Sequence, residues 1–149
     1  MIIAMSVQIF AFGSNMCSGR FRAYGVSPEG PGHAAVLRGY QLLFNKKSTR
    51  DSSGKANVEA HADSDVWGVI YSVPDADIEK LDKGEGGYGR KLLPLHRVDN
   101  SVSNAWVYVA LKPSSDPALH PYTWYVRFLI EGAREHALPA DYVERLGTC

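Results

Sequence analysis

The chain has 149 residues, enough for one domain with a sizeable core. Lys plus Arg and Asp plus Glu both number 16, so the formal net charge is zero, and 45% of the residues are hydrophobic. A chain without a charge excess has no general electrostatic attraction for nucleic acid or anionic lipid. We therefore expect a single domain over residues 1–149 that binds neither nucleic acid nor membranes.

The sequence shows no spacing typical of a metal site. The two cysteines, Cys17 and Cys149, have no nearby partner, and a terminal cysteine is a poor candidate for a structural disulfide. The cluster His61, Asp63 and Asp65 is expected to lie in a polar loop. We expect free thiols, no metal and no cofactor, as in a reducing compartment.

The sequence also shows no pattern typical of a transmembrane helix or a signal peptide. No apolar run approaches the ~20 residues that a transmembrane helix needs. Residues 1–5 are apolar, but they lack a basic start and are too short for the apolar region of a signal peptide. We expect a cytoplasmic protein, present as a monomer or a homodimer.

Strands are predicted for the first part of the chain. Residues 7–12 are β-branched and aromatic, and this strand ends at Gly13. Residues 34–44 are largely apolar, and Gly39 interrupts them, which predicts strands bent at the glycine. Residues 46–56 are rich in Ser, Asp, Lys and Gly, and we predict a mobile loop there.

A short helix separates the first strands from a predicted hairpin. Residues 66–73 form the clearest strand, with the composition of one buried on both faces. Acidic residues in the first turn favour a helix over residues 75–83. Residues 92–98 and 105–111 predict a hairpin that turns at residues 100–101.

The chain ends in helices. Apolar residues recur at helical spacing over residues 122–137, and a second short helix is predicted from Pro139. Strands therefore dominate the first three quarters and helices the last, which indicates the α+β class.

The glycine-rich segment around Glu85 allows three interpretations. Gly84, Gly86 and Gly89 match G-x-G-x-x-G, but a predicted helix precedes them and a Pro94-containing strand follows, the wrong context for a dinucleotide fingerprint. The segment can be a flexible turn with an exposed Glu85. Alternatively, the glycines let a substrate approach a carboxylate at the rim of a barrel. The pattern alone leaves the last two open.

The turn after the first strand also has several interpretations. Ser14 follows a strand as a nucleophilic serine can, but the G-x-S-x-G pattern is missing and the histidines are scattered. Small residues there can instead present successive backbone N–H groups to a carboxylate or an oxyanion. Asn15 can cap the next short helix. The last two interpretations are compatible with each other.

Four segments, in order, carry a resemblance to a known family. Residues 10–16 read FAFGSNM, residues 67–69 read WGV, residues 81–86 read LDKGEG, and residues 132–139 read GAREHALP. Together they resemble the γ-glutamylcyclotransferases, which are related to the AIG2-like cyclotransferases. The similarity runs from residue 9 to residue 146.

The resemblance implies a compact mixed β-barrel with flanking helices. It implies an enzyme that converts a γ-glutamyl-amino acid or amine to 5-oxoproline and the free amine, as in glutathione metabolism, without metal or cofactor. Glu85 corresponds to the family's general acid/base. The implied substrate-binding residues are Phe12, Gly13, Ser14, Asn15, Met16, Tyr108 and Tyr125. Phe12 replaces the usual tyrosine, and this departure bears on substrate identity.

The implied chemistry explains why one carboxylate suffices. The α-amine of the substrate attacks its own γ-carbonyl, so no enzyme nucleophile is needed. A carboxylate within reach of both nitrogens can act first as base and then as acid, and desolvation would raise its pKa toward the working pH. Glu85 and residues 13–15 should therefore face one pocket, although ~70 positions separate them.

Two alternatives remain for the function. The same barrel could bind a γ-glutamyl compound or another acidic metabolite without turnover. It could also release a different amine, for example by removing a γ-glutamyl group from a biosynthetic intermediate.

Overall fold

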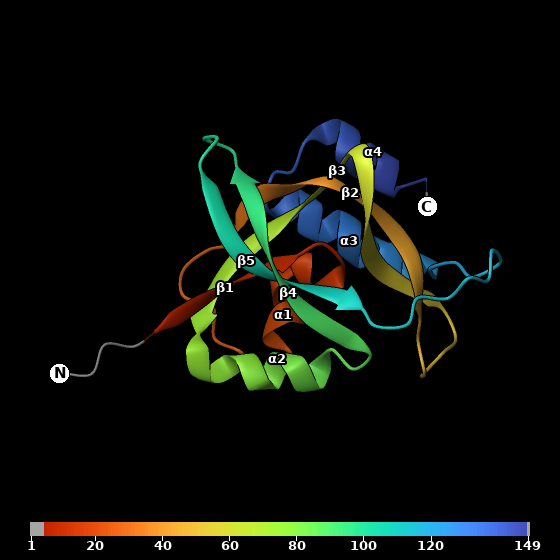
Figure 1. Ribbon diagram of the computed structural model, residues 1–149, viewed down its shortest axis with the longest axis horizontal. Coiled ribbons are helices and arrows are strands. Elements are labelled where there is room, and N and C mark those ends of the chain that lie inside the picture. Colours follow the sequence, from red (N-terminus) through yellow and green to blue (C-terminus); the bar gives the residue numbers. More distant parts are fainter. Residues whose placement is uncertain (1–4, 149) are drawn as a thin grey trace.

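Five strands close into a barrel in the computed structural model, which describes residues 5–148 (Figure 1). The strands are β1 (Ser6–Ala11), β2 (His33–Lys47), β3 (Gly54–Pro74), β4 (Tyr88–Arg97) and β5 (Val102–Ala110). Their order is β1-β3-β2-β4-β5, and the parallel pairing of β1 with β5 closes the ring, with Ile9 opposite Trp106. Closure gives both outer strands of the sheet a neighbour. The predicted α+β barrel is confirmed.

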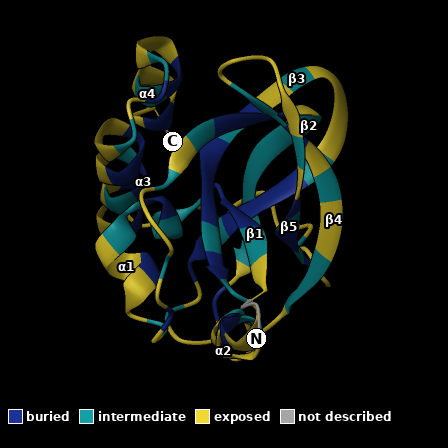
Figure 2. Ribbon diagram, turned by 90° about the vertical axis from the view of Figure 1, so that its left-hand side faces the viewer, coloured by how far each residue is buried: buried dark blue, intermediate teal, exposed yellow. Residues whose placement is uncertain are grey.

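Helices cover one side and one end of this barrel. They are η1 (Ser14–Met16), α1 (Ser18–Arg22), η2 (Asp75–Asp77), α2 (Ile78–Gly84), α3 (Thr123–Glu135) and α4 (Ala140–Leu146). Figure 2 shows α1, α3 and α4 along one side, with α2 at the end of the barrel. The predicted helices at residues 75–83, at 122–137 and after Pro139 are confirmed with small shifts of their ends.

The core fills the barrel and the space under α3. Phe10, Ile70, Val107 and Leu129 of α3 are almost completely buried. The prediction of a strand at residues 66–73 that is buried on both faces holds for most of its side chains. Burial of apolar surface at ~25 cal/mol per Å² is the main term that holds the barrel and α3 together.

The bend predicted at Gly39 is present. Gly39 has φ of 78°, a conformation that favours glycine, and the β2–β3 register shifts between Arg38 and Tyr40. Asp63 on β3 also has a positive φ, of 66°. Two long strands can therefore curve around the barrel while they stay paired.

One loop prediction was too long and a second was wrong. The strands β2 and β3 stay paired as far as Lys47 and Gly54, so only residues 48–53 form the turn, closed by Ser48 N–H donating to the Ser53 carbonyl at 2.8 Å. The polar residues 61–65 lie within β3 and are not a loop. In both places backbone hydrogen bonding to the neighbouring strand determines the structure. The side chains are polar, so the sequence shows no apolar pattern that would predict a strand.

The predicted hairpin is confirmed as β4–β5, with Arg97 N–H bonded to the Ser101 carbonyl at 2.8 Å. The strand β4 begins at Tyr88, four positions before the predicted start, because Tyr88 pairs with Ala110. Among residues 5–148, no helix is long and apolar enough to cross a membrane. The predictions about the first four residues and about Cys149 lie outside the described residues.

A close approach of α3 to η1 gives the first testable prediction. A Cβ on Gly132 would collide with the backbone of Met16 and Cys17. Gly132→Ala should lower the free energy of unfolding by ~1–3 kcal/mol, because the two elements must move apart. Gly19→Ala is the control: open space surrounds that position in α1, and alanine should be neutral or stabilising by up to ~1 kcal/mol there. Urea unfolding measures both, and equal effects would contradict the close-packing argument.

Candidate active site

A cavity of about 640 Å³ opens where the end of β1, the β2–β3 turn and the segment after α2 meet. This size suits a small molecule. Its lining includes seven of the eight residues singled out in the sequence for substrate binding and catalysis, namely Phe12, Gly13, Ser14, Asn15, Glu85, Tyr108 and Tyr125. Met16 lies outside the lining, and its side chain is fully buried in the core.

Glu85 directly follows α2 and contacts the turn after β1. The Asn15 side-chain amide donates to the Glu85 carboxylate, with 2.9 Å between Nδ2 and Oε1. Segments that are 70 positions apart are thus joined at the cavity, as the sequence interpretation required. This contact excludes the interpretation of Glu85 as a carboxylate that points away into solvent.

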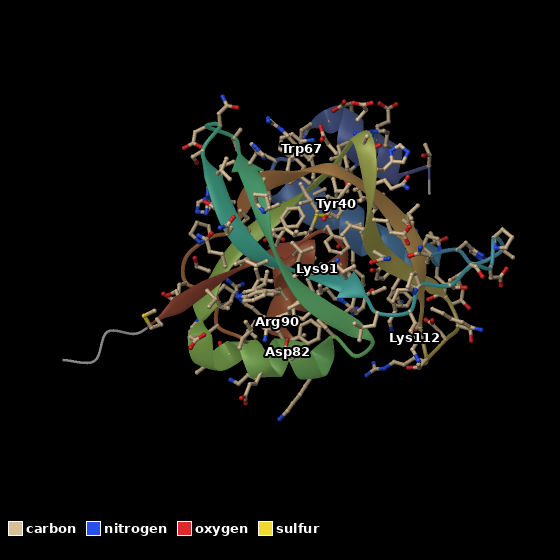
Figure 3. All side chains as sticks on the ribbon, viewed as in Figure 1. Tyr40, Trp67, Asp82, Arg90, Lys91 and Lys112 are labelled. Carbon is tan, nitrogen blue, oxygen red and sulfur yellow. The ribbon has the colours of Figure 1, made fainter. Side chains whose placement is uncertain are left out.

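Hydrogen bonds from two barrel strands hold α2, the helix that directly precedes Glu85. Asp82 of α2 accepts hydrogen bonds from the Tyr108 hydroxyl at 2.7 Å and from Arg90 Nε at 2.8 Å. Figure 3 shows Asp82 and Arg90 close together, one from the helix and the other from β4. The Glu85 N–H donates to the Leu81 carbonyl at 2.8 Å and completes the last turn. The carboxylate therefore projects from a braced helix end.

The pKa of Glu85 is raised from its ordinary value of 4.5 to about 7. Desolvation is the main cause, because burial disfavours the charged form. The Tyr24 hydroxyl, the Asn15 amide and the positive charge of Lys46 act in the opposite direction. A carboxyl group with a pKa near 7 can both accept and return a proton near neutral pH.

The turn after β1 is tightly enclosed. A Cβ on Gly13 would lie 3.0 Å from the Tyr125 hydroxyl and 3.2 Å from the Ala56 Cβ. The expected cap at Asn15 is wrong: α1 begins after Cys17 without a side-chain cap, since the Asn15 amide is directed to Glu85. Within residues 5–148, no histidine is among the cavity-lining residues, so Ser14 has no imidazole base there.

The two predicted tyrosines lie in the wall with different contacts. Tyr125 accepts a hydrogen bond from Ala56 N–H at 3.1 Å, next to Gly13. The Tyr108 hydroxyl donates to Asp82. Burial raises the pKa of both hydroxyl groups, so both stay neutral. Tyr125 therefore contributes directly to the cavity, whereas Tyr108 chiefly positions α2.

The sequence interpretation missed Tyr24, Tyr88 and several cations. Tyr24 follows α1, and its hydroxyl interacts with Glu85 and Asn15. Its ring lies directly against Gly84, where any Cβ would collide with it. The Tyr88 hydroxyl donates to the Ala56 carbonyl at 2.8 Å. The local sequence gives no signal for these roles, which depend on contacts between distant segments.

No group of three or more His, Cys, Asp or Glu side chains within residues 5–148 is arranged to hold a metal ion. Cys17 is a free thiol, and its proposed relation to Cys149 falls outside the described residues. The chemistry that the cavity offers is therefore that of one carboxylate, polar N–H and O–H groups, and cations.

Tyr24→Phe provides a test of the electrostatics that does not depend on any activity. Loss of the hydroxyl removes a group that stabilises the charged form, so the pKa of Glu85 should rise above its wild-type value. A net hydrogen bond of ~1 kcal/mol corresponds to a rise of ~0.7. Carboxyl-carbon NMR across a pH titration measures it. Tyr40→Phe, outside the cavity lining, should leave the titration unchanged. A lower pKa in Tyr24→Phe would contradict the assignment.

Proteins of known name resemble this chain in sequence, and a solved structure resembles it in fold. The γ-glutamylcyclotransferase of Bos taurus is 24% identical over 96% of this chain and 78% of its own length. The Mus musculus γ-glutamylcyclotransferase is 27% identical over 92% of this chain and 75% of its own length. A solved structure described as a γ-glutamyl cyclotransferase superposes with a TM-score of 0.85 at 23% identity, covering 96% of this chain and 87% of the other.

A family model provides the assignment. The model of the AIG2-like family matches residues 65–146, which include the second half of β3, the helix α2 with Glu85 directly after it, and α3 and α4. The match covers more than half of the chain, and the barrel agrees with it. The chain belongs to the AIG2-like family.

Proposed function

We propose that this protein is a γ-glutamylcyclotransferase, which converts a γ-glutamyl-amino acid or amine to 5-oxoproline and the free amine. One observation carries the proposal: Glu85, with a pKa of about 7, is hydrogen-bonded to Asn15 beside the Gly13–Ser14 backbone in a cavity of small-molecule size. The names of the bovine and mouse relatives support the same reaction.

The arrangement suits binding of the γ-glutamyl group. Backbone N–H groups of the turn at residues 13–15 would donate to an oxygen of the substrate, and the neutral Tyr125 hydroxyl would lie beside it. Donors that are already fixed around the γ-carbonyl oxygen can stabilise the negative charge that develops on it. Phe12 closes the wall as a buried apolar ring and supplies no hydroxyl group.

The reaction needs one proton carrier. Glu85 takes a proton from the α-ammonium of the substrate, and the freed amine attacks the γ-carbonyl carbon to form the ring C–N bond. Glu85 returns this proton to the leaving nitrogen as the bond between that nitrogen and the γ-carbonyl carbon breaks. A second proton passes through Glu85 from the ring nitrogen to the departing amine, which leaves as an ammonium ion. The proton count is unchanged, and the carboxylate is regenerated. Holding the substrate folded toward the ring supplies much of the remaining rate enhancement.

Glu85→Gln should lower kcat for 5-oxoproline formation by about 10²–10⁴-fold, because the amide cannot carry the proton. The fold should persist. Since the carboxyl pKa is higher in the folded protein, about 7, than its ordinary 4.5, ionisation opposes folding as the pH rises between these values. The melting temperature of Glu85→Gln at pH 8 should therefore equal or exceed that of the wild type. Near wild-type turnover by this variant would exclude the mechanism.

Two substitutions in the turn distinguish backbone donors from a nucleophilic serine. Gly13→Val would press on Tyr125 and Ala56 and distort the turn, so kcat should fall by about 10²-fold or more. Ser14→Ala retains the backbone N–H groups and should lose less than about tenfold. Steady-state kinetics of both variants provides the test. A nucleophilic serine would reverse this order and leave a trappable acyl-enzyme.

A further inference from the structure

The cavity is strongly positive, although the whole chain has no formal net charge. Among the described residues that line it, Glu85 is the sole acid, and five side chains are cationic: Arg20, Lys46, Arg50, Lys55 and Lys83. Within residues 5–148, only Lys55 of these five has a carboxylate within ion-pair distance, Asp51 at 3.9 Å. The cations therefore leave an excess of positive charge for a ligand to neutralise.

Contacts with aromatic rings hold two of these cations, Lys55 and Arg20, in place. Lys55 Nζ lies 4.3 Å from the ring centres of both Trp124 and Tyr125, and its side chain is only 17% exposed. Arg20 is stacked over the Phe128 ring at 4.6 Å. Such stacking limits the freedom of the long side chains, so less entropy is lost when they bind an anion.

A different cation lies beside the catalytic carboxylate. Lys46 Nζ is 5.3 Å from the Tyr88 ring centre, and the Lys46 Cε packs close to Gly87. Its charge acts on Glu85, whereas Arg20, Lys46 and Arg50 all act on Lys55. Desolvation and then these neighbouring cations lower the pKa of Lys55, although Asp51 opposes them. The cations therefore surround one continuous space that starts at Glu85 and extends toward the β2–β3 turn.

The charges of a γ-glutamyl substrate indicate what this space binds. The γ-glutamyl part has one carboxylate and one ammonium group, which cancel. A leaving amino acid with a neutral side chain adds one carboxylate, and one with an acidic side chain adds two. Only a leaving amino acid with an acidic side chain brings two negative charges to the lysine and arginine side chains beyond Glu85.

We propose that the cavity selects γ-glutamyl compounds whose leaving amine bears two carboxylates, with Lys55, Arg20 and Arg50 as the specificity-determining residues. This inference rests on the proposed function for the reaction, but the charge preference concerns binding and can be measured separately. The side-chain carboxylate of the leaving group binds to Lys55, which the two rings hold, and the arginines flank it.

A pair of nearly isosteric substrates tests the preference. The value of kcat/KM for γ-glutamyl-glutamate should exceed that for γ-glutamyl-glutamine by about tenfold or more, the effect of one charge-assisted hydrogen bond. Added salt should reduce the advantage, because exposed arginines are screened. Equal values, or a preference for γ-glutamyl-glutamine, would overturn the proposal.

Variants connect the preference to the named cations. Lys55→Gln and Arg50→Gln should each reduce the ratio of the two kcat/KM values by severalfold, and the double variant should bring it close to one. Lys91→Gln removes the same charge from an exposed position on β4 outside the cavity lining, and it should leave the ratio at the wild-type value. A ratio that stays at the wild-type value in the double variant would overturn the assignment.

Calorimetry separates the failure of this inference from failure of the proposed function. Glu85→Gln protein should bind γ-glutamyl-glutamate more tightly than γ-glutamyl-glutamine, and adding both Lys55→Gln and Arg50→Gln should bring the two affinities close together. If the binding preference is present but the wild type forms no 5-oxoproline from any γ-glutamyl compound, the proposed reaction is wrong and the charge preference stands. If 5-oxoproline forms but the two compounds bind equally, the charge preference is wrong.

Discussion

A partly desolvated carboxylate can be kept in a protein only if polar groups remain within its reach, and here these groups come from separate segments. The Asn15 amide reaches Glu85 from η1, the Tyr24 hydroxyl from the segment after α1, and the charge of Lys46 from the end of β2. None of these segments is near residue 85 in the sequence. The candidate site therefore depends on barrel closure, because closure brings the end of β1 and the end of α2 to the same cavity.

Closure alone would leave α2 free to shift along the barrel end, and the contacts of Asp82 prevent this. Its carboxylate accepts hydrogen bonds from Tyr108 on β5 and Arg90 on β4, so two neighbouring strands hold one helix. On the opposite side, Gly132 lets α3 approach η1 closely enough to back the turn that carries Asn15. The Asn15–Glu85 contact is thus braced from both directions.

Local pattern was sufficient for the parts of the fold where side-chain periodicity and burial agree. The strand before Gly13, the bend at Gly39 and the helix at residues 122–137 follow from it. It predicted too long a loop at residues 46–56 and a loop in place of a strand at residues 61–65. In both places the strands carry polar side chains, and backbone pairing determines the structure more than burial does. Motif resemblance located Glu85 and the turn beside it. Neither approach could find Tyr24, because its role exists only once the segment after α1 lies against the end of α2.

The value of the Glu85 pKa expresses a balance between two opposing effects. Burial favours the protonated form and so raises the pKa of the carboxyl group. Donors and cations alone would leave an ordinary carboxylate, too weak a base to take a proton from an ammonium group. Desolvation exceeds the combined effect of Tyr24, Asn15 and Lys46, and the pKa reaches about 7. A substrate that neutralises Lys46 and displaces water would shift the balance further toward the protonated form. In the proposed reaction, the carboxyl group would then hold the proton taken from the substrate more firmly, until the developing charge on the leaving nitrogen makes that nitrogen the stronger base.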